Sequence, residues 1–199
     1  MLIAAVVTES EGRALVLAVE QMRQLFVHAG DREWQIDCDL RDDLRFEPAR
    51  PPQICILSLL RELDGALEPI DRVDARLRDE LGRLTARQTA VYICTIFRAC
   101  EDDAARLERI RRLNLLAADL SHDLDIGVID FDRQFADIGA RTLESSYRLE
   151  GNAAREIAAY MIVKTLLAAG AFDDRIPVET IEQARAMYDR SHQANLAHP

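Results

Sequence analysis

Residues 125–132 read Asp-Ile-Gly-Val-Ile-Asp-Phe-Asp, and residues 145–154 read Ser-Ser-Tyr-Arg-Leu-Glu-Gly-Asn-Ala-Ala. The apolar run at 126–131 has the length of a strand and predicts a buried one. The alanine-rich stretch at 152–169 predicts a long helix, and Gly170 is a typical residue to end it. A strand, a loop and a helix in this order are typical of the closing unit of a parallel sheet.

The rest of the chain shows the same alternation of short apolar runs and helical patterns. Further strands are predicted at 2–7, 34–40, 53–60 and 90–97, and further helices at 12–29, 67–84, 102–120 and 177–190. Right-handed crossovers then give a three-layer α/β/α sandwich with a flavodoxin-like, five-stranded parallel sheet of order 2-1-3-4-5. We predict a single domain over 1–190, with 177–190 as an extra C-terminal helix and 191–199 as a flexible tail.

The charge pattern bears on the class of partner. The net charge is −10, and every basic residue except Lys164 is an arginine interleaved with acids. A surface of this kind does not track phosphates, so we predict neither nucleic-acid nor membrane binding. No apolar stretch reaches the length of about 20 residues that a membrane span needs, and the run at 1–7 is too short for a signal peptide. The sequence therefore predicts a cytoplasmic protein.

The cysteine spacing predicts free thiols. Neither a Cys-x-x-Cys pair nor a histidine at zinc-ligand spacing accompanies Cys38, Cys55, Cys94 or Cys100. Cys100 follows a predicted strand and precedes a helix start, which lowers the pKa of a thiol, so a functional thiol there is one alternative. Its adjacent acids oppose that effect, and packing is the other alternative.

Ligands of such sheets bind where the strands end at their carboxyl edge. The candidate binding residues at that edge are Thr8, Glu9, Arg61, Arg98, Cys100, Asp132 and Tyr147. The first turn contains no Gly-x-Gly-x-x-Gly or P-loop motif, so we predict no cofactor. Glu9, Glu11, Asp130 and Asp132 suggest a metal site as an alternative, but helix-start acids explain the two glutamates and we predict no metal.

The stretch at 125–165 resembles the SGNH (GDSL-type) hydrolase family. That family ends its sheet with a strand similar to 126–131, then a loop with Asp-x-x-His, then a small-residue segment that opens the last helix. Here Tyr147 stands where the aspartate would be and Glu150 where the histidine would be. The family's Gly-Asp-Ser block is replaced by Val7-Thr-Glu-Ser10, and its Gly-x-Asn-Asp block by Leu59-Leu-Arg-Glu62.

Two functions follow from this pattern. The first is an SGNH-hydrolase-like domain that lacks standard ester hydrolysis and acts through binding or partner interaction in a biosynthetic or regulatory pathway. The alternative is an esterase or acyltransferase with a rearranged site, in which Ser10 is the nucleophile and Glu150 or His192 the base. The candidate partners are another protein, a second copy of the chain, or an acyl or other small-molecule ligand.

Overall fold

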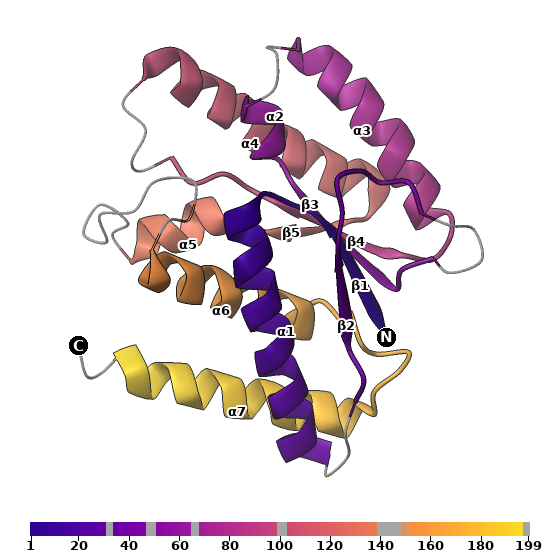
Figure 1. The fold of residues 1–199 in the computed structure, drawn as a ribbon, viewed down its shortest axis with the longest axis vertical. Helices are drawn as coiled ribbons and strands as arrows, with labels where there is room; N and C mark the ends of the chain where they lie inside the picture. Colours follow the sequence, from indigo (N-terminus) through magenta and orange to yellow (C-terminus); the bar gives the residue numbers. More distant parts are fainter. Residues whose placement is uncertain are drawn as a thin grey trace.

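The computed structural model describes residues 1–30, 34–46, 51–64, 68–98, 103–138, 149 and 151–196 (Figure 1). The strands are β1 (Leu2–Val6), β2 (Asp37–Leu40), β3 (Ile54–Ser58), β4 (Ala90–Cys94) and β5 (Gly127–Ile129). The helices are α1 (Glu9–Gly30), α2 (Arg61–Asp64), α3 (Ile70–Thr85), α4 (Ala104–Leu124), α5 (Phe131–Asp137), α6 (Asn152–Ala168) and α7 (Val178–Leu196).

The five strands form one parallel sheet in the order β2-β1-β3-β4-β5, which confirms the predicted fold class and strand order. The register pairs Ala5 with Ile56 and Ile56 with Tyr92 across the three inner strands. β3 is buried at every position, as expected for a central strand covered on both faces. The strands run in one direction, so their carboxyl ends share one edge of the sheet.

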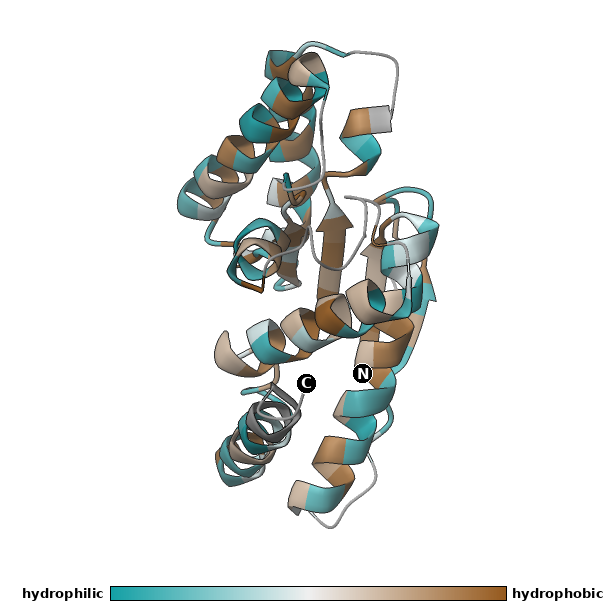
Figure 2. Ribbon diagram, turned by 90° about the vertical axis from the view of Figure 1, so that its left-hand side faces the viewer, coloured by the Kyte–Doolittle hydropathy of each residue, from teal (hydrophilic) through white to brown (hydrophobic). Residues whose placement is uncertain are grey.

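Helices cover both faces of the sheet. α3 and α4 pack together on one face, and α1 and α6 pack together on the other (Figure 1). The buried residues of α1, α3, α4 and α6 are mostly apolar, and brown strands lie between helices that carry both brown and teal residues in Figure 2. α7 packs on α1 and α6, and its apolar side chains Ile181, Ala184 and Tyr188 are buried there.

Local chemistry sets several helix boundaries. The side chain of Asp103 caps α4 by accepting the Arg106 N–H at 2.7 Å. Asp130 caps α5 in the same way by accepting the Arg133 N–H at 3.1 Å. Gly170 has a φ of 69°, so the left-handed conformation expected where a glycine ends a helix is present.

The structure differs from the sequence-based expectation at several elements, and α1 begins at Glu9 rather than at residue 12. α2 and α5 fall in segments expected to be loops, and α7 continues to Leu196 rather than ending at 190. α5 forms because Phe131 and Phe135, four residues apart, both bury their rings, and Phe135 stacks on Phe97 with centroids 4.4 Å apart.

Candidate functional site

A buried carboxylate lies at the carboxyl edge of the sheet, where β1 and β3 end. Glu11 is only 4% exposed, and its Oε1 accepts a hydrogen bond from the Ser58 hydroxyl at 2.6 Å. Its Oε2 accepts two more, from the Thr8 N–H at 2.9 Å and the Thr8 hydroxyl at 2.7 Å. We call Thr8, Glu11 and Ser58 the Glu11 cluster. It ties the first turn of α1 to the end of β3.

The local sequence explains how this cluster forms. Thr8 and Glu11 have the Thr-x-x-Glu spacing of a capping box, in which the two residues satisfy each other's backbone N–H groups at a helix start. The reciprocal bond, from the Glu11 N–H to the Thr8 hydroxyl, is longer at 3.5 Å. Ser58 completes the cluster. Its hydroxyl donates to Glu11 and also accepts the Leu60 N–H at 3.0 Å. Each of these polar groups therefore has a partner although Ser58 is fully buried.

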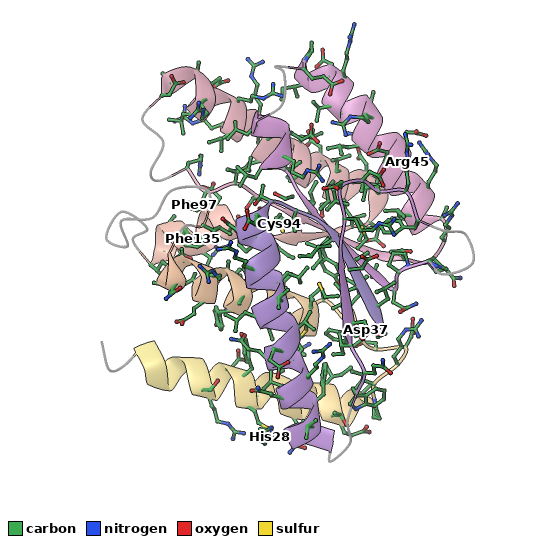
Figure 3. The ribbon with its side chains drawn as sticks, viewed as in Figure 1. His28, Asp37, Arg45, Cys94, Phe97 and Phe135 are labelled. Carbon is green, nitrogen blue, oxygen red and sulfur yellow. The ribbon has the colours of Figure 1, made fainter. Side chains whose placement is uncertain are left out.

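Burial dominates the electrostatics of the cluster. Desolvation raises the pKa of Glu11 above its ordinary value, and the hydrogen bonds from Ser58 and Thr8 oppose that rise. Cys94, at the end of β4, lies beside the first turn of α1 (Figure 3), and its thiol pKa is raised well above the ordinary value by burial and by the Glu11 charge. A protonated, buried thiol is a poor nucleophile, so Cys94 is a packing residue.

Glu9 and Ser10 belong to the same helical turn but lie outside the cluster. Glu9 has an 81% exposed side chain that pairs with Arg13. Ser10 is half-buried, and its hydroxyl makes no hydrogen bond with any residue that the structure describes. Of the three acidic and hydroxyl groups in this turn, only Glu11 is directed into the fold.

A second polar cluster lies where β4 and β5 end. The Thr95 hydroxyl donates to Asp130 Oδ1 at 3.0 Å and accepts the Asp132 N–H at 3.1 Å. Asp132 accepts the Arg98 N–H at 3.0 Å, and its Oδ2 lies 2.8 Å from Arg98 Nε. The structure thus brings together two of the predicted binding residues, Arg98 and Asp132.

An open groove of about 440 Å³ adjoins this cluster, between β5 and α4. Arg98, Arg111 and Asp130 form one polar part of its lining, and Leu115, Ala118 and Val128 form the apolar part. We call it the β5-edge groove, because β5 is the last strand of the sheet.

The remaining predicted residues are dispersed or lie outside the described residues. Arg61 opens α2 and donates to the Asp42 carbonyl at 2.8 Å. Its positive charge still acts on Glu11, where it partly opposes the rise in pKa that burial causes. Cys100, Tyr147 and Glu150 lie outside the described residues. His192 lies in α7, but its side chain is also outside them.

His28 and His122 both lie away from the carboxyl edge of the sheet. His28 is at the end of α1 far from Cys94 (Figure 3), where its Nδ1 lies 2.6 Å from the Gln24 carbonyl. His122 is in the last turn of α4, near the amino end of β5. Neither is placed at the carboxyl edge.

The acids considered for a metal site make other contacts. Glu11 points into its cluster, Glu9 pairs with Arg13, and Asp130 and Asp132 bind Thr95 and Arg98. Within the described part of the chain, no three histidine, cysteine or acidic side chains are grouped as metal ligands would be.

Sequence reasoning missed the roles of Ser58, Thr95 and Asp130. A signal existed for Glu11: it lies in phase with Leu15 and Ala18 on the buried face of α1, whereas Glu9 does not. No comparable pattern marks Ser58 or Thr95, because each is one polar residue at the end of an apolar strand.

Comparison with known proteins gives a structural similarity but no sequence match. No protein-family model matches the chain, and no curated protein matches it in sequence. Among solved structures, the fold is similar to the crystal structure of the acetyl xylan esterase AlAXEase, with a TM-score of 0.62 and 11% sequence identity. The similarity covers 81% of this chain and 98% of that one. The chain therefore has an esterase-like α/β fold.

Among the helices that the structure describes, none combines the length and the apolar character needed to cross a membrane.

Proposed function

We propose that this chain is a binding domain on an esterase-like fold that does not hydrolyse esters, with the carboxyl edge of its sheet as the binding surface. The observation that carries the proposal is the Glu11 cluster. At the ends of β1 and β3, the polar groups that point inward are hydrogen-bonded to each other and buried. They contribute to the stability of the edge, and neither the Glu11 carboxylate nor the Ser58 hydroxyl is exposed to a substrate.

The chemistry of Ser10 supports the same proposal. An alcohol becomes a nucleophile when a base removes its proton within hydrogen-bond reach. Glu11, next to Ser10 in sequence, already accepts three hydrogen bonds from other groups. The Ser10 hydroxyl has no partner among the described residues, as expected for a helix-start serine without a catalytic role.

The alternative function is an esterase or acyltransferase that uses Ser10 with Glu150 or His192. The similarity of the fold to that of an acetyl xylan esterase supports this alternative. In that reaction the Ser10 oxygen would attack the ester carbonyl, the base would take the hydroxyl proton, and the alcohol would leave as the acyl-serine forms.

Hydrolysis of a panel of acyl esters separates the two functions. The panel contains acetyl, butyryl and hexanoyl esters of p-nitrophenol together with acetylated xylan, and each is tested with the wild type and with Ser10→Ala. We expect equal, background turnover from both proteins. Ser121→Ala is the matched control, since Ser121 bonds the Ile126 carbonyl at the opposite edge of the sheet.

Turnover by the wild type that Ser10→Ala abolishes and Ser121→Ala retains would overturn the proposal. In that case Glu150→Gln and His192→Gln would identify the base, because only the variant that removes the base should lose the turnover.

A further inference from the structure

Two arginines, Arg98 and Arg111, line the β5-edge groove next to the second polar cluster. Arg98 is held by Asp132 through its Nε, and its two terminal nitrogens make no hydrogen bond or ion pair with the residues that the structure describes. Arg111 makes one long ion pair, 4.0 Å from Glu108, and its side chain is 53% exposed.

The apolar part of the lining lies next to these arginines along α4. Arg111, Leu115 and Ala118 are four and three residues apart, so they share one face of the helix. Leu115 is 66% exposed, the largest value among the exposed large hydrophobic residues of the described chain. An exposed leucine on the same helix face as Arg111, in a groove that Arg98 also lines, is an arrangement that an amphiphilic ligand could cover.

We propose that the β5-edge groove binds a small organic carboxylate with a short apolar body. The carboxylate binds between Arg98 and Arg111, because guanidinium groups donate paired N–H bonds to carboxylate oxygens. The apolar body lies on Leu115, Ala118 and Val128. A groove of about 440 Å³ is within the range of sites for small ligands.

The acids of the groove do not oppose this ligand equally. Asp132 is paired with Arg98 at 2.8 Å and is 15% exposed. Arg98 therefore offers the ligand N–H donors, and the positive charge that attracts a carboxylate comes mainly from Arg111. Asp130 accepts bonds from Thr95 and from the Arg133 N–H through one oxygen, Oδ1. Its other oxygen would favour a ligand that also carries a hydroxyl or amine, since those groups donate hydrogen bonds.

This inference rests on the proposed binding function and names the class of its ligand. The test is an NMR titration of the ¹⁵N-labelled full chain with hexanoate, hexanamide, acetate and inorganic phosphate. Hexanoate should shift the amides of Leu115, Ala118 and Val128. It should bind about tenfold more tightly than acetate, which lacks the apolar body, and than hexanamide, which lacks the charge.

Two variants and a matched control test the assignment of the groove. Arg111→Gln should weaken hexanoate binding about tenfold, since it removes one of the two guanidinium groups. Leu115→Ser should weaken the binding of hexanoate but not that of acetate. Arg112→Gln is the control, because Arg112 is next in the same helix but pairs with Glu108 at 3.1 Å and does not line the groove.

The proposal is overturned if hexanoate shifts none of these amides, if Arg111→Gln binds as the wild type does, or if phosphate binds as tightly as hexanoate. The same titration with Ser10→Ala separates the two proposals. Binding that persists in this variant, together with Ser10-dependent ester turnover, would reject the non-hydrolytic function and retain the carboxylate site. If hexanoate does not bind and no ester is hydrolysed, only the carboxylate site is rejected.

Discussion

Replacing Glu11 by alanine tests the structural role given to the Glu11 cluster. The change removes the acceptor for three donors, the Ser58 hydroxyl and the N–H and hydroxyl of Thr8. Because Ser58 is fully buried, its hydroxyl loses a partner that water does not replace. Glu9→Ala is a matched control, since Glu9 lies in the same helical turn and is 81% exposed.

The magnitude follows from these contacts. A hydrogen bond to a charged group is worth about 1.5–3 kcal/mol, and loss of a helix cap costs about 0.5–2 kcal/mol. Relief of the buried charge offsets part of that sum. We therefore expect Glu11→Ala to lower the free energy of unfolding by about 3 kcal/mol, a large part of the stability of about 5–15 kcal/mol that is typical of a domain.

Urea unfolding at neutral pH, followed by the fluorescence of the single tryptophan, Trp34, measures both variants. Glu9→Ala should change the free energy of unfolding by no more than about 0.5 kcal/mol, as exposed pairs usually do. The reasoning would be refuted if the Glu11 and Glu9 variants differ by less than about 1 kcal/mol.

Three further results are expected. Burial raises the pKa of Glu11 above its ordinary value of 4.5, so the stability of the wild type relative to the E11Q variant should be greatest below pH 4.5 and fall as pH rises through the folded pKa. Urea unfolding at several pH values measures this difference in stability, and a difference that stays constant or rises with pH would contradict the prediction. Gly127→Ala should destabilise the fold by about 2–4 kcal/mol in thermal or urea unfolding, because an added Cβ would lie 2.3 Å from the ring of Tyr92. Gly82→Ala, whose Cβ meets nothing within 4 Å, should instead add about 0.5–1 kcal/mol, and equal effects of the two changes would reject the packing account. Alkylation with iodoacetamide, read by peptide mass spectrometry, should leave Cys94 unmodified in the folded chain and modify it in urea, because its thiol is buried and its pKa is raised.

The inner strands of the sheet could be predicted from the sequence because they are apolar runs that have to be buried on both faces. β3 illustrates this: its buried residues run continuously from Ile54 to Ser58. The order of the strands followed from right-handed crossovers, which leave few arrangements open. α6 was equally predictable, since its alanine-rich sequence favours a helix and Gly170 ends it.

The site could be predicted only in part. The sequence placed Thr8, Arg98 and Asp132 at the carboxyl edge, but their hydrogen-bond partners depend on the phase of α1 and on the way α5 begins. Glu11 became the buried acid because α1 starts at Glu9, three residues before the expected start. Asp132 met Arg98 because α5 begins directly after β5, where a loop was expected.

The central claim is that the carboxyl edge has no activated serine. Labelling with a serine-directed fluorophosphonate tests this claim most directly. The intact mass of the full chain is measured after incubation with the probe, with the wild type and Ser10→Ala in parallel. The account predicts that neither protein gains the mass of the phosphonyl group. An adduct on the wild type that maps to Ser10 and is absent from Ser10→Ala would contradict it.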